Sequence, residues 1–175
     1  MKVLLHASQL LTIFILSGCV AAAVNTTTYA VKANDRDALF PLAEAGDATA
    51  QYRLGESFCC LGPGFSTQTA TQWLCKSAHQ GNADAMYELG RIYSGDISRS
   101  VAPGQKLRAA LSARESPSHA LLWLSLAAEH GHTEAAGRLA GLDEDISEAD
   151  RLAAANMTVT WREQSCEYDQ VFAEH

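Results

Sequence analysis

The sequence is poor in aromatic residues and in clustered basic residues, and each scarcity excludes a class of structure or function. Aromatic residues make up 7% of the chain although 47% of it is hydrophobic, much of that being alanine. This composition suits closely stacked helices better than a sheet, whose strands favour β-branched and aromatic side chains. The 13 lysines and arginines are outnumbered by 20 aspartates and glutamates and form no run. Because phosphate binding needs a clustered basic surface, we expect no nucleic-acid partner.

The motifs of common catalytic and metal sites are also missing. The chain has no Ser-x-x-Lys, no Gly-x-Ser-x-Gly, no His-Glu-x-x-His and no paired Cys-x-x-Cys. Cys75 and His79 share a helical face at positions i and i+4, and His130 and His132 are close in sequence, but the other soft ligands are scattered. We therefore predict no metal, no cofactor and no catalytic residue, and we interpret Cys75 as a packed cysteine beside a surface histidine.

A ten-residue frame is repeated along the chain. It reads GDATAQYRLG from Gly46 to Gly55, GNADAMYELG from Gly81 to Gly90, and recurs in a degenerate form at 131–140. Trp73 and Trp123 each lie eight residues before the glycine that opens the next copy. The first spacing, from 46 to 81, is 35 residues. This is the size of a helix-turn-helix repeat.

The pattern resembles the Sel-one-like repeat, a relative of the tetratricopeptide repeat. The resemblance rests on Ala48-x-x-x-Tyr52-x-Leu54-Gly55-x-x-Phe58 and on Ala83-x-x-x-Tyr87-x-Leu89-Gly90-x-x-Tyr93, with an Ala-x-x-Trp segment after each. It covers residues from about 35 to 161. The resemblance implies an all-α fold, a right-handed α-solenoid of antiparallel helix-turn-helix repeats.

The repeat pattern divides the domain, which we expect at 34–165, into smaller units. These are a half repeat at 34–45, a repeat at 46–80, a repeat at 81–130 with an insertion at 96–117, and a degenerate repeat with a closing cap at 131–165. Residues 166–175 are left as a tail. Within the last unit we expect a longer helix capped by Asp143.

Residues that recur in register are predicted to form the core. They are Tyr52, Leu54, Gly55, Trp73, Tyr87, Leu89, Gly90 and Trp123. A functional aromatic cage is the alternative for the tyrosines and tryptophans, but repetition in register favours packing. Glycine inside a helix costs about 1 kcal/mol relative to alanine. Gly55 and Gly90 therefore indicate positions where a neighbouring helix crosses and no side chain fits.

The N-terminus has the features of an export signal. Lys2 precedes an apolar run, Val3 to Ile15, that is too short to span a bilayer comfortably. Leu16-Ser-Gly-Cys19 resembles the bacterial lipobox, which makes residues 1–18 a lipoprotein signal peptide and Cys19 the lipidated first residue of the mature chain. The alternative is an ordinary signal peptide with a chance cysteine.

The lipobox also implies a cellular location. Residues 19–33 are rich in small residues and threonine and lack helical periodicity, so we expect a tether. Because Val20 is not aspartate, family analogy implies the outer membrane, with the domain on the periplasmic side. Membrane attachment is then through acyl chains and not through a transmembrane helix.

Four further cysteines, Cys59, Cys60, Cys75 and Cys166, allow three complete disulfide pairings in an oxidising compartment. In a simple helical hairpin Cys60 and Cys75 are offset by about 12 Å along the helices. That exceeds the Cα separation of about 7 Å that a disulfide tolerates. A bridge from Cys59 or Cys60 to Cys75 needs the loop to fold back, and Cys166, on the tail, can reach instead. The sequence leaves the pairing open.

The insertion is the most basic part of an acidic chain, with Arg99, Lys106, Arg108 and Arg114. Insertions in repeat proteins lie on one face and often carry binding, so these four residues form a candidate binding loop. A variable solvent-exposed loop is the alternative.

The resemblance implies a non-catalytic scaffold or adaptor that holds a protein or peptide partner. The alternative function is an accessory protein that binds peptidoglycan or assists exopolysaccharide export, or a weak envelope hydrolase.

Overall fold

The computed structural model describes residues 35–60, 64–96, 114–142 and 146–172. Every regular element in these ranges is helical, which confirms the all-α class for the described part of the chain. The chain divides into residues 1–37 and 38–175, and the helix Ala48–Phe58 and the elements after it belong to the second unit. Residues 1–18, Cys19, the predicted tether, and Arg99, Lys106 and Arg108 lie outside the described residues.

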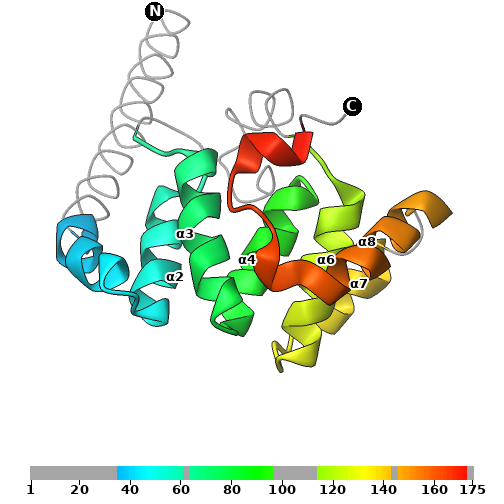
Figure 1. The fold of residues 1–175 in the computed structure, drawn as a ribbon, viewed down its shortest axis with the longest axis horizontal. Helices are drawn as coiled ribbons and strands as arrows, with labels where there is room; N and C mark the ends of the chain where they lie inside the picture. The colour runs from blue at the N-terminus through cyan, green and yellow to red at the C-terminus, as the bar shows by residue number, and fades with distance from the viewer. Residues whose placement is uncertain (1–34, 61–63, 97–113, 143–145, 173–175) are drawn as a thin grey trace, which may run out of the picture. The chain divides into compact units, whose positions relative to one another are not determined.

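Residues 35–44 are helical and are followed by α2 (Ala48–Phe58), α3 (Thr67–His79), α4 (Ala83–Tyr93), α6 (Pro117–Glu129), α7 (Ala135–Leu142) and α8 (Glu148–Thr160). From α2 to α7, each described helix packs against the next, and α8 packs on α6. Helix α3 packs on both α2 and α4, and α6 packs on α4, α7 and α8 (Figure 1). None of the described helices combines the length and the apolarity that crossing a membrane requires.

The repeated glycine frame starts α2 and α4 in the same way. Gly46, Gly81 and Gly131 have φ angles of 96°, 90° and 90°, a region that glycine enters without steric cost. The next residue in the first two copies, Asp47 or Asn82, is the N-cap. Each cap oxygen accepts a hydrogen bond from the backbone N–H three residues on, at 2.7 and 3.1 Å.

Gly55 and Gly90 lie where the next helix crosses closely. A Cβ added at Gly55 would lie 2.6 Å from Leu74 Cγ, and one at Gly90 would lie 2.5 Å from Leu124 Cγ. Both leucines are fully enclosed, at 0% and 1% exposure. The prediction that no side chain fits at these two positions is confirmed.

Most of the predicted core residues lie inside. Leu54, Leu89 and Trp123 are at most 3% exposed, while Tyr87 and Trp73 are buried at 6% and 9%. Tyr52 is the exception, because it is only partly buried. Burial and the neighbouring Glu56 carboxylate raise the pKa of Tyr52 above its ordinary value.

The chain after α7 departs from the predicted boundaries. Ser147 caps α8, and its Oγ accepts a hydrogen bond from Asp150 N at 3.1 Å. Asp143, the predicted cap, lies outside the described residues.

After α8 the chain returns over α3 instead of ending in a tail. It continues through two short 3-10 helices, Trp161–Glu163 and Tyr168–Phe172, and the second packs on α3 (red in Figure 1). Trp161 and Tyr168 are buried. Residues 161–172, which we call the C-terminal segment, are therefore part of the packed structure.

Candidate functional site

A cavity of about 450 Å³ lies beside the end of α4. We call it the α4 cavity. Its lining residues come from α4 and the following turn (Arg91, Ser94, Gly95, Asp96), from the region of α6 (Glu115, Leu124) and from α7 (Gly137, Arg138, Gly141, Leu142). Asp96 directly precedes the undescribed residues 97–113, and Glu115 comes shortly after them. The predicted binding loop therefore begins and ends at this cavity.

Asp96 is the centre of a charged network in the α4 cavity. Its side chain is 5% exposed, and Oδ2 accepts hydrogen bonds from Arg91 Nε at 3.3 Å and from Arg138 Nη1. Arg91 also pairs with Glu88, at 3.0 Å. Two guanidinium groups on one buried carboxylate offset the cost of removing that charge from water. The network therefore fixes the positions of both arginines.

Tyr87 connects this network to the start of α7. Its hydroxyl donates to Glu134 Oε2 at 3.0 Å and accepts from Arg138 Nε at 3.2 Å. The imidazole of His132 stacks on the Tyr87 ring, with centroids 3.9 Å apart and planes 15° apart. Tyr87 thus has a polar role in addition to the packing role that its repeat position predicts.

Arg114 is the described member of the predicted binding loop, and it contacts the C-terminal segment. Its Nη1 lies 3.2 Å from Asp169 Oδ1, and its guanidinium carbon lies 4.2 Å from the centroid of the Phe172 ring. The Tyr168 hydroxyl donates to the Arg114 carbonyl at 3.5 Å. The ion pair is about half exposed, at 47% and 64%, so its contribution to stability is small. Arg114 therefore contacts another segment of the same chain.

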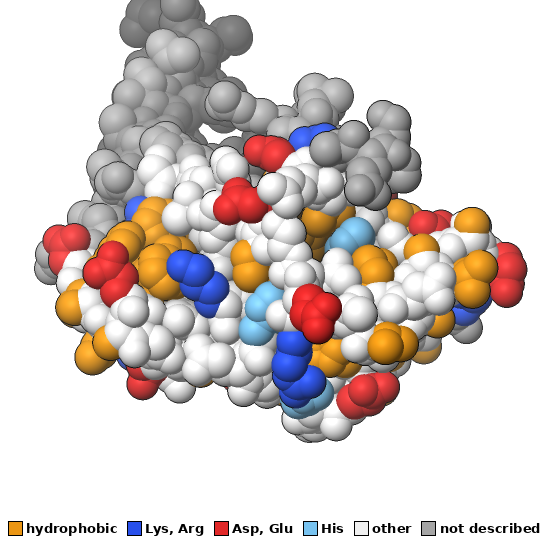
Figure 2. Space-filling model, in the orientation of Figure 1, with side chains coloured by type: hydrophobic (Ala, Val, Ile, Leu, Met, Phe, Trp, Pro, Cys, Tyr) orange, Lys and Arg blue, Asp and Glu red, His pale blue; other side chains and the backbone are white. Residues whose placement is uncertain are grey.

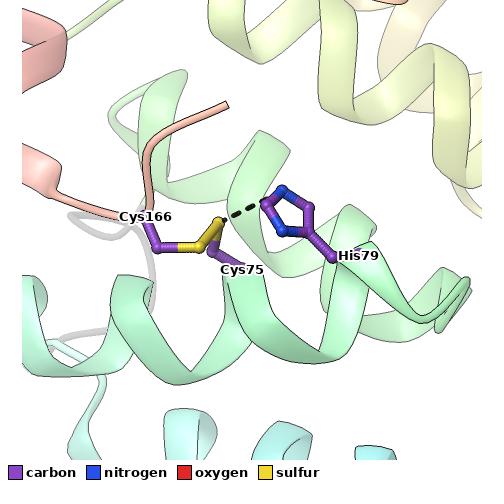
Figure 3. Close-up of side chains that lie close together, drawn as sticks. All are labelled: Cys75, His79 and Cys166. Atoms are coloured by element: carbon purple, nitrogen blue, oxygen red, sulfur yellow. Dashed lines mark hydrogen bonds between the residues drawn. A yellow bond between two sulfur atoms is a disulfide. The ribbon is translucent and has the colours of Figure 1, made fainter. Parts of the chain in front are cut away.

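The four cysteines in the described part of the chain form two disulfides. Cys75 in α3 is bonded to Cys166 in the C-terminal segment, with the Cα atoms 5.5 Å apart (Figure 3). Cys59 and Cys60 are bonded to each other. The hairpin geometry had opposed a bridge between Cys60 and Cys75, and the structure contains none.

His79 completes a cluster around the Cys75–Cys166 disulfide. It lies one helical turn after Cys75, and its Nε2 is 3.6 Å from Cys75 Sγ (Figure 3). The ring is half-buried beside Trp123 and Trp161, with centroids 6.2 and 6.1 Å away, so its interpretation as a surface histidine was wrong. Burial lowers the pKa of His79, and a hydrogen bond to the backbone of Trp161 opposes this effect only in part. The imidazole is therefore neutral near pH 7.

Sequence reasoning missed the third member of this cluster. The ligand atoms of Cys75, His79 and Cys166 all lie within 4.8 Å of one another. The i, i+4 spacing signals the first pair, but Cys166 is 91 residues from Cys75 and no local pattern connects them.

A second cavity, of about 340 Å³, lies under the C-terminal segment next to this cluster. The helices line it with Cys75, Leu89, Tyr93, His119 and Trp123, and the later part of the chain adds Met157, Gln164, Ser165, Gln170 and Val171. Burial lowers the pKa of His119 and raises the pKa of Tyr93, so both are uncharged near neutral pH. The lining of this cavity therefore carries no charge near neutral pH, in contrast to the α4 cavity.

The surface around these features has little charge clustering. Figure 2 shows that Lys and Arg side chains on the viewed face are separated by other residues, and that hydrophobic side chains gather over the helices nearest the N-terminus, at the left. In that helical region Phe40 and Leu42 are 37% and 55% exposed.

Comparisons of the chain with protein-family models, with curated proteins and with solved structures found no match. The interpretation as Sel-one-like repeats therefore depends on the sequence pattern and on the geometry that the repeated positions share.

Proposed function

We propose that the chain is a non-catalytic interaction scaffold, built as a right-handed solenoid of Sel-one-like helix pairs, that holds a protein or peptide partner. Two shared geometries support the solenoid. The frame glycines Gly46 and Gly81 have nearly the same φ, and Gly55 and Gly90 each meet a leucine of the following helix at nearly the same distance. A repeated unit with repeated contacts stacks in the same way each time.

The observation that carries the binding role is the position of the α4 cavity at the base of the insertion. A cavity of about 450 Å³ is in the size range of small-ligand and side-chain pockets. Arg91, Arg138 and Asp96 hold one another in place, so the charged wall of the α4 cavity has its shape before a partner arrives. Preorganisation of this kind reduces the entropy cost of binding. A peptide segment with polar side chains matches these groups.

We further propose that the scaffold is exported and held at the periplasmic face of the outer membrane by a lipid on Cys19. The lipobox pattern supports this location. The Cys75–Cys166 and Cys59–Cys60 disulfides agree with it, since disulfides persist in oxidising compartments.

Site-specific photo-crosslinking in intact bacterial cells tests the scaffold role. The crosslinking amino acid replaces Ser94, which lines the α4 cavity, and in a matched control it replaces Val159, which is 85% exposed in α8 and lines neither cavity described above. We expect a discrete protein adduct from position 94 that is absent from position 159. Deletion of residues 97–113 should remove the adduct.

The other outcomes distinguish the alternative function. Equal protein adducts from both positions would show unspecific surface contact and would refute the cavity as the binding site. Recovery of muropeptides or polysaccharide at position 94, with no protein, would replace the adaptor by the saccharide-binding accessory function. The variant Arg138→Gln, which removes one guanidinium from Asp96, should weaken the protein adduct in the same assay.

A further inference from the structure

We propose that Cys75, His79 and Cys166 form a metal site for a thiophilic d10 cation, Zn²⁺ being the probe, when the Cys75–Cys166 disulfide is reduced. The site goes beyond the scaffold role and does not depend on it, and in the oxidising compartment proposed above it forms only where a dithiol reductant opens the disulfide. Its ligands come from a single turn of α3 and from the C-terminal segment, so the metal would join the same two elements that the disulfide joins.

The geometry of the cluster fits a tetrahedral ion. With Zn–S near 2.3 Å and Zn–N near 2.05 Å, ligands at the tetrahedral angle have S···N separations of about 3.6 Å and S···S separations of about 3.8 Å. The separation of His79 Nε2 and Cys75 Sγ is 3.6 Å. All three ligand atoms are within 4.8 Å of one another. The two sulfur atoms must move apart after reduction, and Cys166 Sγ must come to the same distance from His79 Nε2 as Cys75 Sγ, which side-chain rotation of the freed cysteines allows.

The orientation of His79 also suits a ligand. Its Nε2 faces Cys75 Sγ at 3.6 Å, and the ring lies beside Trp123 and Trp161, with centroids 6.2 and 6.1 Å away. These neighbouring rings restrict the movement of the imidazole and keep Nε2 directed at the sulfur.

The two sulfur atoms differ in solvent exposure, so a reductant attacks one of them first. Cys75 is 3% exposed, whereas Cys166 is partly exposed. A dithiol reductant therefore attacks Cys166 Sγ, forms a mixed disulfide there, and releases Cys75 as a thiolate beside His79. The second thiol of the reductant then frees Cys166, and the reductant leaves as a disulfide with two electrons fewer. The two protons of the dithiol pass to the cysteine sulfurs or to solvent, and metal binding keeps both sulfurs as thiolates, releasing to solvent any proton that they carry.

The cluster supplies three ligands, and no fourth His, Cys, Asp or Glu joins it among the described residues. The fourth tetrahedral position is then open to water or to an added ligand. Three protein ligands with one open position are typical of zinc sites that bind small molecules, and two thiolates with one imidazole are a known ligand set for zinc.

The test is a Co²⁺ titration of the full chain with Cys19, Cys59 and Cys60 changed to serine, so that Cys75 and Cys166 are the remaining cysteines. The protein is reduced with a phosphine and compared with its oxidised form, in which the disulfide cannot ligate. We expect one Co²⁺ per reduced chain, with a thiolate-to-cobalt charge-transfer band and the visible bands of a tetrahedral site, both removed by stoichiometric Zn²⁺. The oxidised form should show neither.

The variant His79→Gln separates the three-ligand site from binding by two thiols alone. It should lower the Zn²⁺ affinity by at least about tenfold while circular dichroism shows an unchanged helix content. An unchanged affinity, or no cobalt bands in the reduced protein, would overturn the proposal. If the serine variant does not fold, wild type is compared with Cys166→Ala, which keeps Cys59 and Cys60. Equal cobalt spectra from those two proteins would overturn it as well.

Discussion

Replacing Gly90 with alanine should destabilise the protein, whereas the same change at Gly137 should stabilise it. A Cβ at Gly90 would lie 2.5 Å from Leu124 Cγ, 2.8 Å from its Cδ2 and 3.2 Å from its backbone nitrogen. Because the last of these atoms belongs to the backbone of α6, a rotation of the leucine side chain cannot relieve every contact. At Gly137 in α7 nothing lies within 4 Å of the added carbon.

Two terms of opposite sign determine the result. Alanine is the better helix former by about 0.8–1 kcal/mol, and overpacking a core costs about 1–3 kcal/mol or somewhat more. The contacts at Gly90 put the change at the upper end of that range, so the net loss in the free energy of unfolding should be about 1–2 kcal/mol. Gly137→Ala has only the first term and should gain about 0.5–1 kcal/mol.

Chemical unfolding followed by circular dichroism, with the disulfides intact, measures both changes as shifts of the midpoint at constant slope. A double-mutant cycle then identifies the cause. Leu124→Ala removes Cγ and Cδ2 and costs about 2–5 kcal/mol, but Gly90→Ala added to it should cost at least about 0.5 kcal/mol less than it does alone. Stabilisation at Gly90, or strict additivity with Leu124→Ala, would contradict the close crossing of α4 and α6.

Three further predictions concern the disulfide, the buried carboxylate and pH. In a variant with Cys59 and Cys60 changed to serine, and with a chelator present, reduction of the Cys75–Cys166 disulfide should lower the free energy of unfolding by about 2–5 kcal/mol, because the bond closes a long loop. An unchanged unfolding midpoint would contradict the presence of this disulfide. Arg138→Gln should lower the free energy of unfolding by about 1–3 kcal/mol, because it leaves the buried Asp96 with one guanidinium fewer. Arg114→Gln removes an exposed ion pair and should lower it by under about 1 kcal/mol. Equal losses of stability in denaturant titrations of the two variants would refute this difference. Burial lowers the pKa of His119, so the unfolded chain takes up its proton first, and thermal unfolding should show a loss of stability as pH falls below about 6.5. This loss should be smaller in His119→Gln, and an unchanged pH dependence would contradict the assignment.

The sequence predicts the helix pairs well because their determinants are local and occur twice. A helix starts at Asp47 and Asn82 because the preceding glycine has a positive φ and the cap oxygen lies three residues before its donor. The close crossings at Gly55 and Gly90 follow from the cost of glycine inside a helix, which needs a compensating reason at both positions.

Neither candidate site could be predicted in the same way, because each joins residues that are far apart in the chain. Asp96 reaches Arg138 across 42 residues, and Cys75 reaches Cys166 across 91. His79 looks like a surface residue from its place beside the inter-repeat glycine, and it is half-buried because Trp161 covers it from the C-terminal segment. These positions depend on the path of the chain after α6, and no short-range pattern fixes that path.

Both sites form where the repeat pattern breaks. The α4 cavity lies at the insertion, where the spacing from Gly81 to Gly131 is 50 residues in place of the 35 from Gly46 to Gly81. The Cys–His cluster lies where the C-terminal segment returns over α3. This has a physical reason, because residues at repeated positions are occupied in packing each helix pair against the next. The charged groups and the sulfur atoms of these two sites converge where the regular repeat spacing ends. A shortened chain with the regular 35-residue spacing and no C-terminal segment should therefore retain its helix pairs and lose both sites.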